Sequence, residues 1–248
     1  MDIKAVLLDM DGTLINNDRN RFGAEYTELV YRRFPKKIPF NKFKEAIYIS
    51  FEAMTKNNGQ KTNEKVFHDT FFPLINFPLS QGIKIFDHVH KHDFASLKRE
   101  EEVIPETYGV VKKILDMGYK VVIATNPIFP LDVMYERLKW ANIDKLPFEL
   151  VTSYETSTYA KPNPLYYREI LDKIGSEPED CLMVGDEHMD MVASLIGIKT
   201  MFIKSASSDL NEQTPMPNFK GELSDIISIL QGGHDGTFRT NSQRKEEN

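Results

Sequence analysis

The sequence predicts an α/β fold in which helices cover both faces of a parallel sheet, with a helical segment inserted after the first strand. Three observations support this prediction. From about residue 102 onward, short apolar runs alternate with helical patterns. The runs are almost wholly apolar, as expected of strands that are buried on both faces. Between residues 16 and 101 the alternation is interrupted, and only helical patterns occur.

Composition and charge are ordinary for a soluble globular protein. Of the 248 residues, 41% are hydrophobic and 27% are charged, and the formal net charge of −6 gives no reason to expect nucleic acid as a partner. The single cysteine, Cys181, excludes an internal disulfide and fits a reducing cytoplasm. The apolar run near the N-terminus is too short for a signal peptide, and none approaches the ~20 residues that cross a bilayer. We therefore expect a cytoplasmic protein without a membrane partner.

The first strand is expected at residues 3–8, a short run rich in apolar and β-branched side chains. It is followed by Asp9-Met10-Asp11-Gly12, whose acids and glycine are typical of a turn. Residues 1–15 are therefore assigned to the core of the fold.

Residues 16–101 are expected to form a helical cap. Asn41, Asn63 and Ser80 are interpreted as the N-caps of three helices, because each precedes apolar residues at helical spacing. Four phenylalanines are interpreted as the core of this cap rather than as a substrate site: Phe67, Phe71, Phe72 and Phe77. No cap residue carries a motif that identifies a substrate.

The second part of the core is expected at residues 102–231. Strands are predicted at 120–124, 148–153, 181–184 and 199–203, and helices at 105–115, 131–141, 164–174 and 191–196. Three of these helices are followed by a glycine, which commonly ends a helix: Gly118, Gly175 and Gly197. The tail from Gly232 onward is polar except for Phe238, and we expect it to be disordered.

Polar side chains follow the strands at the points where they end. Asp9, Thr125 and Asp186 each come directly after an apolar strand, and Lys161 lies in the loop after the strand at 148–153. In an open parallel sheet, ligands bind beyond the carboxyl ends of the strands. We therefore expect these four residues to converge at one edge of the sheet.

The carboxylates among these residues are suited to metal binding and to nucleophilic attack. Asp9 could attack phosphorus or bind a metal ion, and Asp11 stands beside it next to flexible Gly12. Asp186 and Asp190 are four residues apart where a helix begins, so both can face the same way. Several carboxylates around one divalent cation form the hard-oxygen site that magnesium prefers.

The remaining residues are suited to binding phosphate. Lys161 supplies a positive charge, and the Thr125 hydroxyl with nearby backbone N–H groups can hold phosphate oxygens. Taken alone, Thr125-Asn126 would be interpreted as a helix cap before Pro127, and Lys161 as a solvated loop lysine. The ordered set of strand-end residues favours the functional interpretation.

With these residues the sequence resembles the haloacid dehalogenase-like superfamily, whose core is a Rossmann-like parallel sheet. Four motifs occur in the expected order: Asp9-Met10-Asp11-Gly12-Thr13-Leu14, Val121-Val122-Ile123-Ala124-Thr125-Asn126, Lys161-Pro162, and Val184-Gly185-Asp186 with Asp190. The resemblance covers the first fifteen residues and roughly 102–231. One such motif is moderately specific, whereas the ordered set of four is strong.

The resemblance implies a phosphatase mechanism. Asp9 would attack the phosphorus of a small phosphorylated metabolite and form an aspartyl-phosphate, and Asp11 would act as acid and then as base. Mg²⁺ would be held by Asp9, by the backbone carbonyl of Asp11 and by Asp186, while Asp190 would support the metal's water shell or orient Lys161. In addition, Thr125, Asn126 and Lys161 would bind the phosphoryl group.

The alternatives come from different classes of protein. A phosphosugar mutase of the same superfamily shares all four motifs, and differs in how its cap excludes water. A dehalogenase and a phosphonate hydrolase are disfavoured, because this superfamily's members with those activities generally lack the second aspartate and Asp11 is present. A binding protein on a retired catalytic fold is disfavoured because none of the four expected residues is missing: Asp9, Asp11, Lys161 and Asp186.

Overall fold

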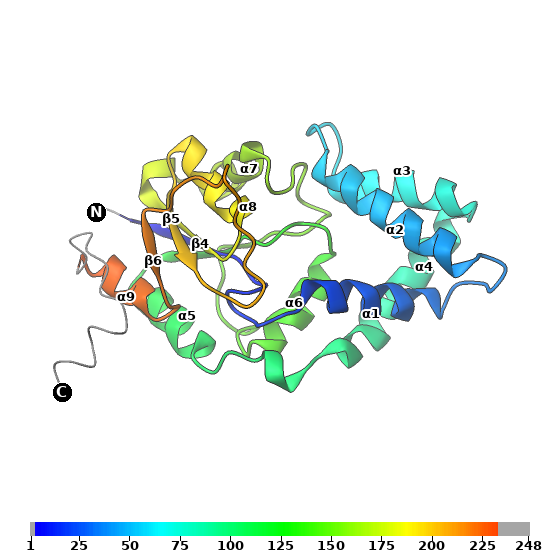
Figure 1. Cartoon of the computed structure of the whole chain (residues 1–248), viewed down its shortest axis with the longest axis horizontal. Coiled ribbons are helices and arrows are strands. Elements are labelled where there is room, and N and C mark those ends of the chain that lie inside the picture. The colour runs from blue at the N-terminus through cyan, green and yellow to red at the C-terminus, as the bar shows by residue number, and fades with distance from the viewer. Residues whose placement is uncertain (1–2, 233–248) are drawn as a thin grey trace.

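A computed structural model of the chain describes residues 3–232 (Figure 1). Six parallel strands form one sheet in the order β3-β2-β1-β4-β5-β6, with helices on both faces. The predicted α/β fold with a Rossmann-like sheet is confirmed. The predicted disorder concerns the tail from Gly232 onward, and all of it except Gly232 lies outside the described residues.

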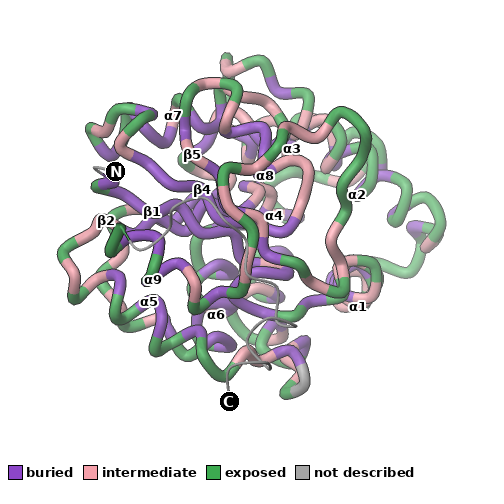
Figure 2. The backbone as a smooth tube through the Cα atoms, turned by 60° about the vertical axis from the view of Figure 1, so that its left-hand side comes forward, coloured by how far each residue is buried: buried purple, intermediate pink, exposed green. Residues whose placement is uncertain are grey.

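The sheet is built around β1 (Ala5–Leu8), which lies between β2 (Lys120–Ile123) and β4 (Cys181–Gly185). Its alternate side chains enter two different cores, because successive residues of a strand point to opposite faces. Ala5 and Leu7 pack with the helix at 164–174, whereas Val6 and Leu8 pack with the helices on the other face. Figure 2 shows these central strands as the most continuously buried part of the chain. The apolar runs in the sequence are thus explained by burial on both faces.

The other core elements surround this centre. The remaining strands are β3 (Leu150–Val151), β5 (Lys199–Ile203) and β6 (Phe219–Gly221). The helices are α5 (Thr107–Asp116), α6 (Leu131–Trp140), α7 (Pro164–Ile174), α8 (His188–Met191) and α9 (Asp225–Leu230), with 3₁₀ turns at Glu100–Glu102, Pro178–Asp180 and Val192–Ile196. In Figure 1, α7 and α8 lie on one face of the sheet and α5 and α9 on the other.

Helix α7 shows how local sequence sets an element's bounds. The side chain of Asn163 accepts a hydrogen bond from the backbone N–H of Leu165, and Pro164 occupies the first turn, where its missing N–H is harmless. The helix ends at Gly175, whose φ of 60° is a conformation that glycine adopts at no steric cost. The predicted bounds of this helix are confirmed at both ends.

Residues 16–101 form four helices that lie to one side of the sheet (Figure 1, right). They are α1 (Arg19–Tyr31), α2 (Phe40–Thr55), α3 (Asn63–Ile75) and α4 (Leu79–His88), and α4 is continued by a π-turn at Val89–Asp93 and a 3₁₀ turn at Phe94–Leu97. Phe67, Phe71 and Phe72 are buried among these helices. The division into a core and a cap at these boundaries stays a prediction.

The three N-caps predicted in this segment are wrong. Helix α2 begins at Phe40 and α4 at Leu79, each directly after a proline, so that Asn41 and Ser80 lie inside the first turn. The proline fixes the extended backbone from which each helix starts, and no side-chain cap is used. Helix α3 is capped by Thr62, whose hydroxyl accepts a hydrogen bond from the Lys65 backbone.

Asn63 has a different role, because it joins α3 to two loops of the core. Its buried side-chain amide donates to the carbonyl oxygens of Pro127 and Tyr159, at 3.1 Å each. Its backbone N–H donates to Ser157, and the next backbone N–H, that of Glu64, donates to Tyr154, both at 2.9 Å. Four hydrogen bonds therefore fasten the start of α3 to the loops that follow β2 and β3.

The sequence did not predict β6 or α9, and it made the strand at 148–153 longer than the two residues of β3. Strand β6 is a three-residue edge strand without an apolar run. Among the described helices, none has the length and apolar character needed to cross a membrane.

Candidate active site

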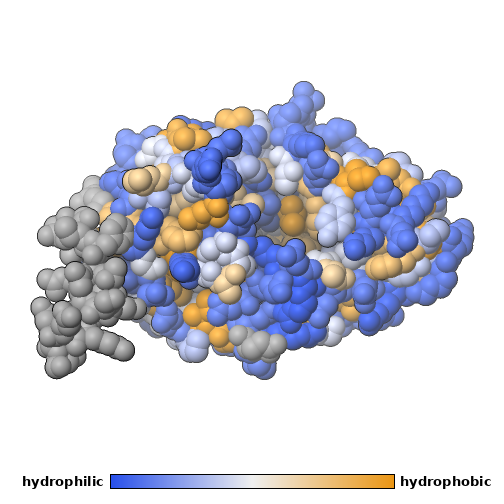
Figure 3. Space-filling model, in the orientation of Figure 1, coloured by the Kyte–Doolittle hydropathy of each residue, from blue (hydrophilic) through white to orange (hydrophobic). Residues whose placement is uncertain are grey.

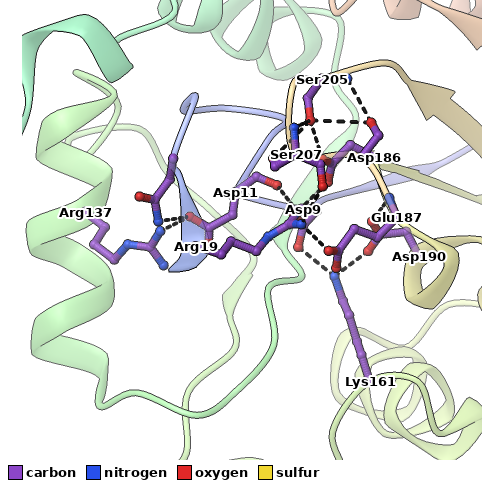
Figure 4. Close-up of polar contacts among 12 residues, drawn as sticks. Asp9, Asp11, Arg19, Arg137, Lys161, Asp186, Glu187, Asp190, Ser205 and Ser207 are labelled. Carbon is purple, nitrogen blue, oxygen red and sulfur yellow. Dashed lines mark hydrogen bonds and ion pairs between the residues drawn. The ribbon is translucent and has the colours of Figure 1, made fainter. Parts of the chain in front are cut away.

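The predicted site residues lie at the carboxyl edge of the sheet (Figure 4). Asp9 follows β1, Thr125 follows β2 and Asp186 follows β4, so neighbouring strands place them side by side. Lys161 arrives from the loop after β3, and Asp190 from the short helix α8. All five are buried. Parallel pairing thus brings together residues that are separated by up to 181 positions in the chain.

Lys161 is the cation at the centre of this group. Its Nζ lies 2.7 Å from Oδ1 of Asp9 and 2.6 Å from Oδ1 of Asp190. Burial by itself lowers the pKa of the Lys161 ammonium, but the carboxylates of Asp190 and Asp9 outweigh it and hold that pKa well above its usual value. The lysine is therefore charged, and it fixes the orientation of both carboxylates.

Three carboxylates form a cluster that fits a divalent cation. Ligand oxygens of Asp9, Asp186 and Asp190 lie within 4.8 Å of one another, and all three residues are buried. Burial raises the pKa of Asp9 to about 6 despite the nearby lysine, and burial also raises the pKa of Asp186. Buried acids that are short of positive charge, with only hard oxygen donors, are suited to magnesium.

Asp186 and Asp190 are positioned in this cluster in a way that the sequence did not predict. Asp186 precedes α8 and does not lie on it, so the two acids do not share a helical face. Asp190 instead accepts a hydrogen bond from the backbone N–H of Glu187 through Oδ2, as part of a capping box, and turns Oδ1 toward Lys161. The glycine that precedes Asp186, Gly185, is required because a Cβ there would overlap the Asp190 carboxylate.

The side chain of Asp11 lies apart from the carboxylate cluster. Its Oδ1 accepts hydrogen bonds from Asn17, at 2.7 Å, and from Nη2 of Arg137, a buried residue of α6 (Figure 4). Burial raises the pKa of Asp11, but the ion pair with Arg137 and the hydrogen bonds outweigh it, and the net pKa lies below the usual value. Only the backbone carbonyl of Asp11 is directed toward the other site residues, where it accepts from Arg19.

Arg19, the first residue of α1, inserts its guanidinium between core carboxylates (Figure 4). Its Nη2 lies 2.8 Å from the carbonyl oxygen of Asp11 and 2.8 Å from Oδ1 of Asp186, and Nη1 contacts Glu187. Two of the oxygens predicted to hold magnesium are thus bonded to an arginine. Helix α1 is thereby tied directly to the acids at the carboxyl edge of the sheet.

The loop after β5 completes the surroundings of Asp186. Ser205 and Ser207 donate hydroxyl hydrogen bonds to its Oδ2, while Oδ1 faces Arg19. Burial raises the pKa of the neighbouring Glu187 to about 7, although Arg19 opposes this shift. Both carboxylate oxygens of Asp186 therefore accept a hydrogen bond.

Thr125 and Asn126 line the cavity that opens above these acids. The carbonyl oxygen of Thr125 accepts hydrogen bonds from the hydroxyls of Thr152 and Tyr166, at 2.8 and 2.7 Å, which holds the turn after β2 in place. Oδ1 of Asn126 is buried and has no hydrogen-bond partner among the residues that the structure describes. Both residues are positioned to contact a ligand in the cavity.

The sequence missed Arg19 and Arg137. Arg137 carried a detectable signal, because it occupies the apolar stripe of α6 between Val133 and Leu138, where a charged residue needs a buried partner. Arg19 carried none, since an arginine in the first turn of a helix is usually exposed to solvent.

Comparison with known proteins agrees with the motifs. The sequence profile of the haloacid dehalogenase-like hydrolases matches residues 3–194. The curated proteins that match include pyrophosphatase PpaX of Bacillus cereus strain AH820, at 29% identity over 236 residues, which cover 93% of this chain and 97% of that protein.

Solved structures show the same fold at low identity. A predicted phosphoglycolate phosphatase of Haemophilus somnus 129PT matches with a TM-score of 0.57 and 17% identity, covering 93% of this chain and 99% of that one. The 2-haloacid dehalogenase of Pseudomonas syringae pv. tomato DC3000 matches with a TM-score of 0.63 and 17% identity, covering 94% and 100%. At such identities the likeness concerns the fold alone.

Proposed function

The chain belongs to the haloacid dehalogenase-like hydrolases, and from this premise we propose that it is a magnesium-dependent phosphatase that hydrolyses a small phosphate monoester through an aspartyl-phosphate on Asp9. The observation that carries the proposal is the placement of Asp9, a buried carboxylate at the end of the central strand with the Lys161 ammonium 2.7 Å away. Asp11 supplies a second carboxylate to the lining of the same cavity.

In the first step, an oxygen of the Asp9 carboxylate attacks phosphorus and the bond from phosphorus to the ester oxygen breaks. The leaving oxygen takes a proton from the Asp11 carboxyl group. Arg137 favours the ionised form of Asp11, and an arriving phosphate dianion opposes it, because a nearby negative charge raises a carboxyl pKa. Lys161, the Thr125 hydroxyl and the side chain of Asn126 bind the phosphoryl oxygens.

In the second step, Asp11 takes a proton from a water molecule that attacks the phosphorus of the aspartyl-phosphate. The bond between phosphorus and Asp9 breaks, which releases orthophosphate and restores the Asp9 carboxylate. The carboxylate form of Asp11 that Arg137 favours is the form this step requires.

The residues proposed to hold magnesium are Asp9, Asp186 and the backbone carbonyl of Asp11, while Asp190 orients Lys161 and supports the metal's water shell. When bound, a divalent cation offsets the charge of the carboxylates and of the phosphate oxygens. Arg19 donates to Asp186 and to the Asp11 carbonyl, so metal binding and these two hydrogen bonds compete for those oxygens.

Replacing Arg19 tests whether it competes with magnesium for these oxygens. We expect Arg19→Met to bind Mg²⁺ about tenfold more tightly, because hydrogen bonds to charged groups no longer have to be broken. Isothermal titration calorimetry measures the affinity directly, without reference to turnover. Arg21→Met is the matched control, since Arg21 lies on the same helix and pairs with Glu102 outside the site. Unchanged or weaker magnesium binding in Arg19→Met would contradict the assignment.

The substrate is proposed to be a small phosphorylated metabolite, and a cytoplasmic location is proposed from the single cysteine, Cys181. The relatives named pyrophosphatase support phosphoryl transfer as the chemistry. A dehalogenase stays disfavoured because Asp11 is present and is held in place by Arg137. A phosphosugar mutase shares every residue of the mechanism, and differs in needing a bisphosphate activator.

A panel of phosphorylated metabolites tests the proposal. We expect steady release of orthophosphate in the presence of Mg²⁺, loss of that release after chelation with EDTA, and recovery when Mg²⁺ is added back. A mutase would release little orthophosphate and would require a bisphosphate. Activity that is undiminished by chelation would refute the metal assignment, and the absence of phosphate release from every compound would refute the phosphatase.

A further inference from the structure

The cavity above the carboxylates has two ends of different chemistry. Its volume is about 290 Å³, and it extends from Asp9, Asp11 and Thr125 to helices α1 and α2. Figure 3 shows this face hollowed between the two halves of the molecule, with apolar surface inside the hollow and hydrophilic surface around it. In a bound phosphate ester, the phosphate would lie at the end with Asp9, and the group esterified to it would lie at the end formed by α1 and α2.

The far wall of the cavity is apolar. Five side chains from α1, α2 and the loop after β2 form it: Phe22, Ile47, Phe51, Ile128 and Phe129. The ring of Phe129 packs edge-to-face against Phe22 and against Phe51, with ring centroids 5.9 Å apart in both pairs. These three rings thus make a continuous aromatic surface that faces the acids.

Several polar groups of the lining are already engaged or lie at the rim. Three buried atoms have no partner among the described residues, and they belong to the end that holds Asp11 and Thr125: Oδ1 of Asn17, Oδ1 of Asn126 and Nε of Arg137. The hydroxyl of Thr27 donates to the Gly23 carbonyl oxygen at 2.7 Å. The two arginines of the lining are paired with carboxylates, Arg19 with Asp186 and Arg137 with Asp11. Tyr48 lies at the mouth of the cavity and is 64% exposed. Arg137 lies against this wall, with its guanidinium carbon 5.0 Å from the centre of the Phe22 ring, and its Nη2 is bonded to Asp11. Among the described lining residues, the five apolar side chains themselves offer neither a cation nor a hydrogen-bond donor.

Gly23 enlarges the cavity at this end. It lies inside α1, where glycine is the least suitable residue after proline. A Cβ placed on Gly23 would have no atom within 4 Å, whereas one on Gly82, in the helix α4, would overlap Phe72. The space beside Gly23 is thus open, and a larger side chain there would project into the cavity rather than into the protein.

We propose that the group esterified to phosphate is a compact apolar body, such as a single aromatic ring, which packs against Phe22, Phe51 and Phe129. This rests on the proposed phosphatase activity and names its substrate class. The hydroxyls of a sugar would be buried here without partners, and the second phosphate of a pyrophosphate would meet an apolar wall. An apolar ring, by contrast, gains from leaving water.

Two esters of primary alcohols test the proposal, because their intrinsic reactivity is similar. We expect kcat/KM for benzyl phosphate to exceed that for glycerol 3-phosphate by about 100-fold, within the range by which apolar pockets discriminate. Inorganic pyrophosphate is expected to be a poorer substrate than benzyl phosphate. Equal or better hydrolysis of glycerol 3-phosphate or of pyrophosphate would overturn the proposal.

A substitution that fills the cavity tests whether the space beside Gly23 determines the preference for an apolar ester. We expect Gly23→Leu to lower kcat/KM for benzyl phosphate at least about tenfold, and to leave that for the much smaller acetyl phosphate within about twofold. Gly109→Leu is the matched control, because Gly109 is an exposed helical glycine of α5 with equally open surroundings. Gly23→Ala, a milder filling that suits a helix, should act in the same direction and serves if the leucine variant does not fold. Equal losses on both substrates, or no loss on benzyl phosphate, would refute the location.

The outcomes separate this proposal from the one on which it rests. If no compound, acetyl phosphate included, releases orthophosphate, the phosphatase itself is wrong. If orthophosphate is released but polar esters are preferred, the phosphatase stands and the apolar substrate class is wrong.

Discussion

Replacing Asp9 by asparagine is expected to lower kcat by at least about 10³-fold, because the amide cannot act as the nucleophile that forms the covalent intermediate. The fold should be unaffected, since asparagine has nearly the same shape and Lys161 keeps its bond to Asp190. Orthophosphate release measures the activity, and circular dichroism with thermal unfolding checks the fold. Asp132→Asn, the same change at an exposed position in the first turn of α6, is the control.

A second measurement addresses the intermediate itself. Acid quenching of the native enzyme during turnover, followed by mass spectrometry, should find one phosphoryl group on the peptide that contains Asp9. Residual activity of more than a few per cent in Asp9→Asn, in a protein that is correctly folded, would exclude covalent catalysis by this residue.

Replacing Lys161 by methionine is expected to destabilise the protein by about 3–5 kcal/mol, because two buried carboxylates lose the cation that they share. Turnover should fall as well, since Asp9 loses its orientation and the phosphoryl group loses a positive partner. Urea unfolding measures the stability. Lys112→Met removes an exposed ion pair with Asp116 on α5, and is expected to change stability by about 1 kcal/mol or less.

A double variant distinguishes charge from packing. Adding Asp190→Asn to Lys161→Met removes one of the uncompensated carboxylates, so we expect much of the lost stability to return while activity stays low. If Lys161→Met were as stable as the native protein, the lysine would not be the counter-ion of the cluster. If the double variant were no more stable than the single one, the loss would arise from packing instead.

The sequence predicts the core more completely than the cap. Strands β1 and β4 are buried at every residue, and β2 and β5 at most of theirs, so their location follows from burial. Helix α7 carries its own boundaries in Asn163 and Gly175. Within residues 16–101, Pro39 and Pro78 start helices without a side-chain cap, which is why the N-caps predicted at Asn41 and Ser80 are wrong.

Some residues of the candidate site could likewise be predicted from the sequence, and others could not. Residues at strand ends could be predicted, because parallel strands bring their carboxyl ends to one edge wherever they lie in the chain. The partners that arrive from helices could not, since their contacts depend on how the cap and α6 pack against the sheet. Arg19 reaches Asp186 across 167 positions, and Arg137 reaches Asp11 across 126. The positions of these residues in the sequence do not indicate that they form pairs.

The attachment of α3 to the loops after β2 and β3 by Asn63 limits how substrate could enter the cavity and how product could leave it. A rigid swing of the helices away from the sheet would break all four of its hydrogen bonds to the loops after β2 and β3. At about 1 kcal/mol each, these bonds disfavour such an open state by roughly a factor of 10³. The same loops carry Thr125 and Lys161, so a swing at α3 would also disturb the phosphate-binding residues. We therefore expect molecules to exchange mainly past the exposed Tyr48, which lines the cavity, with the helices and the sheet still joined.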